Sequence, residues 1–188
     1  MDLAMFSQIA EITDCLYLSS AAAVKGEKIR LLGITHIINL TMDIPNLKMP
    51  NVESTQIHVD DVPSANLGVY FDRCADKINQ VARQRGRTLV HCVAGISRSS
   101  SICIAYLMKY QNMPLDQAYR HCKRCRSVVH PNIGFFKQLV DFERRLFGRN
   151  TVRMVQSNIG LVPEVYIKET EHMVWLPSSR PGRSHYGY

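Results

Sequence analysis

The sequence lacks any apolar run long enough to cross a membrane, which takes roughly 18 to 20 residues. Its first residues, 1–7, contain neither the basic start nor the long apolar stretch of a signal peptide. The second residue is aspartate rather than glycine, which excludes the N-myristoylation pattern. We therefore expect no membrane span and no export signal.

A disulfide framework is also missing, because the six cysteines of this chain follow no framework spacing. In a protein of this length without an export signal, such cysteines are expected to be reduced thiols. The sequence therefore predicts a cytoplasmic protein, with the nucleus as a second location. The six residues are Cys15, Cys74, Cys92, Cys103, Cys122 and Cys125.

Internal repeats and low-complexity tracts are absent as well, so the whole chain is neither a repeat protein nor a disordered one. Its 188 residues correspond to roughly one domain, and 46% hydrophobic with 21% charged residues is typical of soluble globular proteins. Lysine and arginine exceed aspartate and glutamate by 23 to 16, a net charge of +7. This excess favours anionic partners, with phosphorylated substrates and nucleic acid the first candidates.

Short β-branched, apolar runs alternate along the chain with segments of helical periodicity. Strands interleaved with helices are typical of the α/β class, in which helices cover the faces of one sheet. We therefore predict a single α/β domain around a central, mostly parallel or mixed sheet of about five strands. The predicted strands are 15–18, 34–40, 52–59 and 88–92, and the predicted helices are 24–32, 69–83, 97–110, 114–125 and 132–146.

The residues at the helix ends support these limits. Gly33 and Gly148 suit C-terminal caps, Asn132 suits an N-terminal cap, and Pro114 suits the first helical position. The helix predicted over 97–110 is apolar on nearly all sides. We therefore expect that helix in the middle of the molecule.

The chain divides into four predicted parts. Residues 1–8 form an N-terminal segment, and residues 9–148 form the domain that holds the predicted strands and helices. Residues 149–176 keep enough apolar side chains to pack on this domain as an extension. Residues 177–188 are rich in proline, glycine, serine and arginine, which predicts a flexible tail.

One segment combines the end of a strand, a short loop and the start of a helix: His91-Cys92-Val93-Ala94-Gly95-Ile96-Ser97-Arg98-Ser99. In this arrangement the loop amides turn inward and the helix N-terminus adds partial positive charge, which together form an anion cradle. Gly95 permits so tight a loop, and the planar fork of Arg98 can hold two oxygens of a tetrahedral oxyanion. We therefore predict a phosphate site made by Val93, Ala94, Gly95, Ile96, Ser97 and Arg98.

Cys92 is the predicted nucleophile of this site. A thiol beside an arginine at a helix N-terminus is expected to be ionised at neutral pH. A thiolate that faces bound phosphate implies transfer of the phosphoryl group to sulfur and then hydrolysis of that intermediate. Ser99 can donate a hydrogen bond to the sulfur and ease its departure. A core thiol and a surface arginine are the plainer interpretation, but the whole strand–loop–helix pattern with its glycine favours the phosphate site.

This segment resembles the signature His-Cys-x-x-Gly-x-x-Arg-Ser/Thr of the protein tyrosine phosphatase superfamily, and its loop is most similar to that of the dual-specificity phosphatases. The segments Ala105–Met108 and Pro131–Phe135 resemble two further elements of that group. With Phe147–Val152, the chain is similar to the small atypical members that consist of a catalytic domain only. The resemblance implies the cysteine-phosphatase fold, with residues 9–148 as the catalytic domain, and no metal or organic cofactor.

The superfamily takes the proton for the leaving oxygen from an aspartate on a loop that precedes the cysteine. Asp60 and Asp61 both lie on such a loop here. The family's Asp-x-Pro spacing matches Asp61-Val62-Pro63, so the resemblance implies Asp61 as general acid and then as general base. Asp60 stays open as an alternative, and so does an ordinary loop role for both.

Loop composition and chain length bear on the substrate. Val93, Ala94 and Ile96 are neutral, whereas similar phosphoinositide phosphatases carry lysines there, which disfavours a highly charged inositol lipid. The chain is too short for the loop that deepens the pocket of the larger tyrosine-specific relatives. The resemblance therefore implies a shallow pocket for phosphotyrosine and for phosphoserine or phosphothreonine. The implied partners are phosphorylated proteins, with mitogen-activated protein (MAP) kinases first, and no nucleic acid.

Two other functions stay open. The same chemistry on RNA 5′-triphosphate or on a phospholipid is compatible with the net charge of +7. A catalytically silent scaffold that binds phosphoproteins is the third candidate, although such proteins usually lose the cysteine or the arginine that this chain retains. The oligomeric state is not indicated.

Several other polar residues carry weaker signals. Cys122 and Cys125 have a zinc-like spacing, but without a second ligand pair we expect packed thiols and no metal. His91 is expected to orient the loop, and His130 stands where many similar proteins carry arginine, so that any help in substrate binding would depend on pH. A basic cluster is predicted to be a solvated helix face or a docking patch: Arg120, Lys123, Arg124 and Arg126. The thiols that could trap oxidised Cys92 are Cys15, Cys74 and Cys103.

Overall fold

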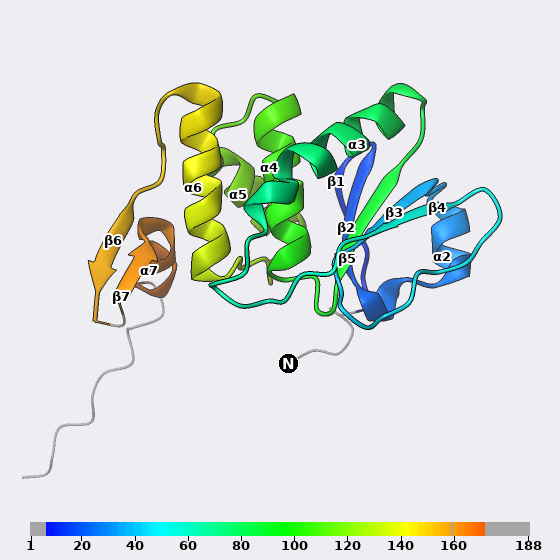
Figure 1. Cartoon of the computed structure of the whole chain (residues 1–188), viewed down its shortest axis with the longest axis horizontal. Coiled ribbons are helices and arrows are strands. Elements are labelled where there is room, and N and C mark those ends of the chain that lie inside the picture. Colours follow the sequence, from blue (N-terminus) through cyan, green and yellow to red (C-terminus); the bar gives the residue numbers. More distant parts are fainter. Residues whose placement is uncertain (1–6, 159, 172–188) are drawn as a thin grey trace, which may run out of the picture.

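The structure is a computed structural model that describes residues 7–158 and 160–171. The predicted tail over 177–188 lies outside the described residues. The core of the fold is one five-stranded sheet in the order β1-β2-β5-β3-β4, parallel except for β1, which runs antiparallel to β2 (Figure 1). This confirms the predicted α/β class and mixed sheet. The strands are β1 (Ala10–Thr13), β2 (Leu16–Ser20), β3 (His36–Asn39), β4 (Glu53–Gln56) and β5 (Thr88–Cys92).

Helices cover both faces of this sheet (Figure 1). On one face, α2 (Gly26–Leu31) packs through Ile29 against a small cluster that includes Ile37 and Leu89. On the other face lie four longer helices around the main core. They are α3 (Phe71–Arg83), α4 (Arg98–Tyr110), α5 (Leu115–Cys125) and α6 (Ile133–Phe147), and two 3₁₀ turns, η1 (Ala21–Ala23) and η2 (Gly68–Tyr70), precede α2 and α3.

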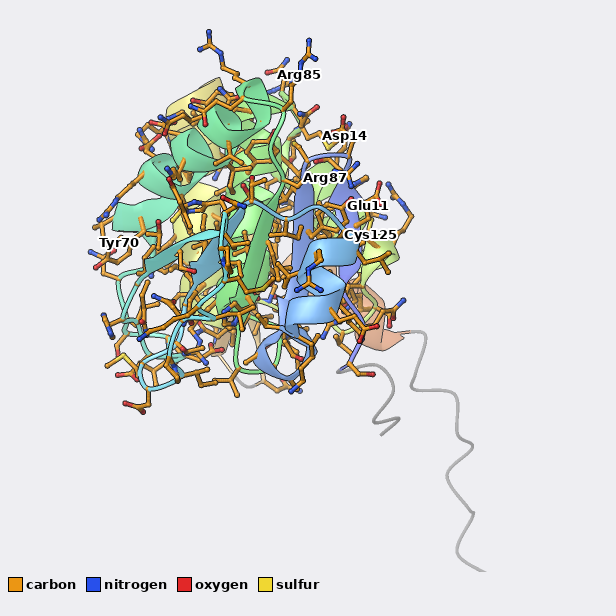
Figure 2. The ribbon with its side chains drawn as sticks, turned by 90° about the vertical axis from the view of Figure 1, so that its right-hand side faces the viewer. Glu11, Asp14, Tyr70, Arg85, Arg87 and Cys125 are labelled. Atoms are coloured by element: carbon orange, nitrogen blue, oxygen red, sulfur yellow. The ribbon has the colours of Figure 1, made fainter. Side chains whose placement is uncertain are left out.

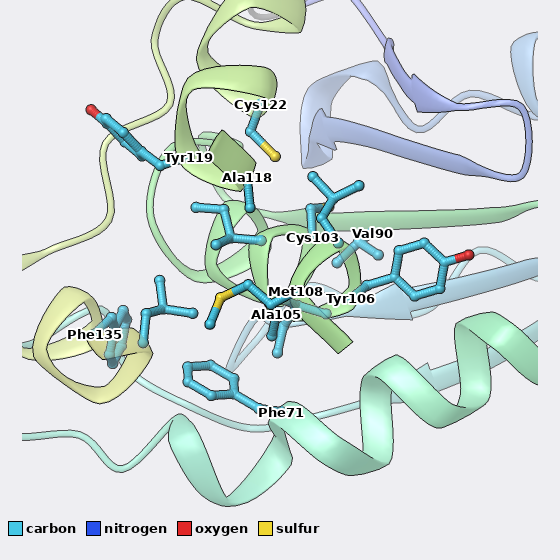
Figure 3. Close-up of a cluster of buried hydrophobic side chains, with 14 of the residues drawn as sticks. Phe71, Val90, Cys103, Ala105, Tyr106, Met108, Ala118, Tyr119, Cys122 and Phe135 are labelled. Atoms are coloured by element: carbon cyan, nitrogen blue, oxygen red, sulfur yellow. The ribbon is translucent and has the colours of Figure 1, made fainter. Parts of the chain in front are cut away.

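Helix α4 lies at the centre of the molecule, as its sequence predicts. Every residue from Arg98 to Met108 is buried, because α4 contacts α3, α5, α6 and the sheet. Figure 3 shows Cys103, Ala105 and Met108 of α4 among side chains from the neighbouring elements. This burial fixes the N-terminus of α4 directly behind the loop that follows β5.

The local signals at the helix ends are mostly confirmed. Gly33 and Gly148 have positive φ angles of 64° and 70° after α2 and α6, and the Asn132 side chain accepts a hydrogen bond from the Phe135 amide at the start of α6. The prediction for Pro114 is wrong by one residue. Its ψ of 154° is extended, so Pro114 is the N-cap of α5 and Leu115 is the first helical residue.

The described part of the segment after α6 packs on the domain. It forms a hairpin of β6 (Met154–Ser157) and β7 (Gly160–Pro163), followed by α7 (Glu164–Glu171). In Figure 1 these elements lie beside α6, at the end of the molecule away from α2. Val152, Val165 and Tyr166 join the main hydrophobic core. The limits predicted for the four parts of the chain, 1–8, 9–148, 149–176 and 177–188, stay predictions.

No helix within the described residues has both the length and the apolarity of a membrane span.

Candidate active site

Cys92 ends the central strand β5, between the ends of β2 and β3. Its side chain is buried, and its Sγ accepts two hydrogen bonds of 3.2 Å, from the Gly95 amide and from Ser99 Oγ. Ser99 itself is fully buried in the first turn of α4. Both donors therefore point at the sulfur from the floor of the loop.

The carbonyl groups of the loop all face the protein. Val93 O accepts from the Ala21 amide at 3.1 Å, and Ile96 O accepts from the His130 amide at 2.9 Å. The two carbonyls between them accept from the guanidinium of Arg126. Because the N–H of a trans peptide points opposite to its C=O, the amides of residues 94–97 face the concave side of the loop. The predicted phosphate-binding residues 93–98 are thus brought together as one cradle.

Gly95 is required by two features of this cradle. Its φ is +69°, a conformation that costs side-chain-bearing residues energy. A Cβ at this position would also lie 2.5 Å from the Ser19 carbonyl carbon and 2.7 Å from the Ser20 nitrogen. The loop therefore packs directly on the end of β2, and only glycine permits that approach.

Arg98 is the first residue of α4 and is 7% exposed. Its Nη1 donates to Val59 O at 3.1 Å, and its Nε lies 3.5 Å from Asp61 Oδ2. That buried Nε has no hydrogen-bond acceptor among the described residues. The guanidinium is thus held in place by one bond while further donors stay available for an oxyanion.

The structure brings Asp61, rather than Asp60, to the cradle. Asp61 Oδ1 accepts from Ser97 Oγ at 2.7 Å and from Asn132 Nδ2 at 2.9 Å. Asp60 is exposed, and no hydrogen bond or ion pair of its side chain is found within residues 7–158 and 160–171. The carboxyl group of Asp61 therefore sits at the rim of the loop beside Arg98.

Helix α6 holds the loop that carries Asp61. A Cβ on Gly134 would lie 1.9 Å from Pro63 O, so the first turn of α6 touches this loop with no room for a side chain. Further along α6, Gln138 accepts from the Gly68 amide at 2.6 Å and donates to Ala65 O at 2.9 Å. The close packing on Pro63 therefore gives a physical reason for the glycine in the segment Pro131–Phe135, which resembles an element of the dual-specificity phosphatases.

The prediction of a solvated face is wrong for Arg126. This residue is 3% exposed; its Nε donates to Gly95 O at 2.9 Å and its Nη2 to Ala94 O at 3.1 Å. Burial lowers the pKa of its guanidinium, and the nearby Cys92 sulfur opposes that shift. The sequence held a signal, since position 126 continues the buried stripe of α5 four residues after Cys122.

The remaining candidates lie at or behind the cradle. Burial lowers the pKa of His91, whose backbone carbonyl accepts from the Leu40 amide; that its side chain orients the loop stays a prediction. All six cysteines are unpaired. Burial raises the pKa of the Cys74 thiol to about 12 and raises that of Cys103 as well, so neither is ionised at neutral pH.

Cys122 and Cys125 point into different surroundings. Cys122 is fully buried in the core (Figure 3), whereas Cys125 is half-buried and packs at the edge of the core near Glu11 (Figure 2). Burial raises the pKa of Cys125; the Arg124 charge lowers it and the Glu11 charge raises it. Among residues 7–158 and 160–171, no three histidine, cysteine or acidic side chains gather as a metal site would require.

A buried cysteine below a ring of inward amides, followed by an arginine at a helix start, defines a cysteine-based phosphatase. The family model "Dual specificity phosphatase, catalytic domain" matches residues 16–145, and the chain belongs to this family. It is a dual specificity phosphatase of the small atypical type.

Individual relatives and a solved structure support the same family. The chain is 48% identical to human dual specificity protein phosphatase 14 over 167 residues, 88% of this chain and 84% of that protein. It is 42% identical to human dual specificity protein phosphatase 18 over 172 residues, which cover 90% and 91% of the two. A crystal structure of a mouse putative dual specificity phosphatase complexed with zinc tungstate superposes with a TM-score of 0.72 at 32% identity, covering 74% of this chain and 89% of that one.

Proposed function

We propose that this chain hydrolyses phosphotyrosine and phosphoserine or phosphothreonine in proteins through a cysteinyl-phosphate intermediate. The observation that carries the proposal is the pair of hydrogen bonds from Gly95 N and Ser99 Oγ to Cys92 Sγ, at the floor of a loop whose amides face inward. These donors prepare the sulfur to attack and later to leave. Among phosphorylated proteins, MAP kinases are the substrates to test first.

In the first step, the Cys92 thiolate attacks phosphorus while the bond to the substrate oxygen breaks. Arg98 and the amides of residues 94–97 bind the phosphoryl oxygens as charge develops on them. Asp61, as a carboxylic acid, donates its proton to the leaving oxygen. The products are the free hydroxyl of the substrate and a phosphate bonded to Sγ.

In the second step, the Asp61 carboxylate takes a proton from a water molecule, and the water oxygen attacks phosphorus. The bond between phosphorus and Sγ breaks, and the Ser99 hydroxyl stabilises the departing thiolate by its hydrogen bond. Inorganic phosphate leaves, and Asp61 is again protonated for the next turnover.

The neutral loop supports a phosphomonoester substrate. Arg98 is the cationic side chain of the cradle, while Val93, Ala94 and Ile96 add no charge for further phosphates. The mouse protein above is described as complexed with zinc tungstate; tungstate is a tetrahedral oxyanion like phosphate. We expect tungstate and vanadate to inhibit this chain by occupying the cradle.

The two aspartates provide the test. Asp61→Asn removes the proton donor and should lower kcat by roughly 10²- to 10⁴-fold, the usual contribution of general acid catalysis. Asp60→Asn is the matched control and should leave kcat within about twofold, because the Asp60 side chain is exposed and has no hydrogen bond or ion pair to the described part of the chain. Equal losses in the two variants would contradict the assignment.

The wild-type protein and the two aspartate variants, assayed on a panel of phosphorylated compounds, test the class of substrate. Doubly phosphorylated MAP-kinase activation-loop peptides, RNA 5′-triphosphate and a phospholipid vesicle should be compared by phosphate release. A preference for RNA or lipid over every phosphopeptide would overturn the protein substrate but leave the chemistry intact.

A further inference from the structure

Helix α7, which lies after the segment matched by the family model, contacts the wall of the site through Tyr166. The Tyr166 hydroxyl donates a hydrogen bond of 2.6 Å to Pro131 O. Its ring stacks on the imidazole of His130, with centroids 3.9 Å apart and planes inclined by 22°. Both contacts fall on the connection between α5 and α6.

That connection touches the catalytic loop and the acid. The His130 amide donates to Ile96 O, and the Asn132 amide donates to Ser97 Oγ, both at 2.9 Å. The Asn132 side chain donates to Asp61 Oδ1 at 2.9 Å. Pro131, which accepts from Tyr166, is thus directly bonded in the chain to the residue that holds Asp61.

Tyr166 is itself firmly placed. It is 8% exposed, and its ring meets Phe136 edge to face at 5.1 Å. Burial raises the pKa of its hydroxyl, so this group is a hydrogen-bond donor throughout the neutral range. The contact with Pro131 O is therefore a fixed feature of the folded chain.

We propose that Tyr166 is a positioning residue for the general acid: α7 fixes the Pro131–Asn132 peptide, and through Asn132 it fixes the carboxyl group of Asp61. The proposal rests on the proposed role of Asp61. It gives the extension after α6 a part in the reaction in addition to its part in packing.

The experiment uses a series of aryl phosphates whose phenols span a range of pKa values. A poor leaving group needs the proton of the acid, whereas a good one leaves without it. We therefore expect Tyr166→Phe to lower kcat/KM about fivefold for the worst leaving group, the rate equivalent of one hydrogen bond, and to change it little for the best. The isosteric phenylalanine keeps the ring contacts, and circular dichroism of each full-length variant confirms the fold.

Tyr119→Phe is the matched control. It removes a hydroxyl from the same interface, where Tyr119 donates to Glu169 Oε1 at 2.8 Å, but leaves Pro131 O paired. Its leaving-group dependence should equal that of the wild type. His130→Gln, at an exposed position, removes only the stacked ring and should shift the dependence in the same direction as Tyr166→Phe by a smaller amount.

Asp61→Asn tests the general acid separately from the positioning role of Tyr166. If this variant shows no steeper leaving-group dependence than the wild type, the proposed general acid is wrong. If it does, and Tyr166→Phe keeps the wild-type dependence or matches Tyr119→Phe, the positioning role of Tyr166 is overturned.

Discussion

At the scale of single residues, two buried arginines lie at the loop that follows Cys92. Within the described residues, Arg98 donates one hydrogen bond, to Val59 O, and lies beside Asp61, which leaves further donors for the proposed ligand. Arg126 instead donates to Ala94 O and Gly95 O on the outer side of the loop. In the proposed mechanism, one guanidinium therefore binds the oxyanion, while the other holds the peptide groups of the loop in place.

This division predicts the effect of removing Arg126. Arg126→Met removes the donors to the buried Gly95 carbonyl and the part-buried Ala94 carbonyl, so the loop amides lose their preset direction. We expect kcat/KM for an aryl phosphate to fall about 10- to 100-fold, with weaker inhibition by vanadate. Steady-state kinetics with vanadate titration measure both.

Arg124→Met is the control for Arg126, since Arg124 is exposed near the end of the same helix. Its kinetics should match those of the wild type. If instead Arg124→Met impairs turnover of a small aryl phosphate as much as Arg126→Met does, the hydrogen bonds from Arg126 to the loop are not the cause of the loss.

The sequence predicted the residues of the cradle because they are contiguous. Cys92, Gly95, Arg98 and Ser99 lie within eight positions, and strand–loop–helix geometry fixes how they meet. The partners that complete the site are distant in the chain. Asp61 meets Asn132 across 71 positions, and no local pattern indicates that contact. Such pairs follow from the packing of α6 on the loop that carries Asp61, which only the folded structure shows.

At the scale of secondary structure, the elements with strong local signals were predicted well. The strand 88–92 has the predicted limits, and the cap residues Asn132 and Gly148 delimit α6 as expected. Strand β1 was missed, because its four residues alternate between buried and exposed positions over too short a length to stand out. The hairpin β6–β7 and α7 were predicted only as apolar residues that pack on the domain.

Buried Glu143 on α6 joins three of these elements. Its carboxylate accepts from the Leu115 amide at the start of α5 at 2.8 Å, and from the amide and hydroxyl of Thr151 at 2.8 and 2.6 Å. One side chain thus caps α5 and fixes the turn that leads into the C-terminal extension.

Replacing Glu143 should therefore destabilise the fold. Glu143→Ala leaves the buried Leu115 amide and the part-buried Thr151 amide without this acceptor, and we expect the free energy of unfolding to fall by about 3 kcal/mol. Urea denaturation followed by circular dichroism measures this. Asp141→Ala, which removes an exposed carboxylate from the same helix, should leave the midpoint nearly unchanged; an equal effect in both would contradict the capping role.

At the scale of the whole molecule, the reacting groups meet where three layers of structure end. The sheet supplies Cys92, and α4 supplies Arg98 and Ser99. The loop before η2 supplies Asp61, which accepts a hydrogen bond from the N-cap residue of α6. The C-terminal extension supports this edge from outside through Tyr166. If the proposed role of Tyr166 holds, the extension belongs to the catalytic unit, although the family model ends at residue 145.

The account depends most on the covalent intermediate at Cys92. Because Ser99 Oγ donates to Sγ, Ser99→Ala should slow the departure of the thiolate and let the phosphorylated enzyme accumulate during turnover of an aryl phosphate with a good leaving group. Acid quenching followed by peptide mass spectrometry should find one added phosphoryl group on Cys92, and none in Cys92→Ser. A quenched Ser99→Ala enzyme that turns over substrate yet carries no phosphoryl group on Cys92, or carries it on another residue, would contradict the account.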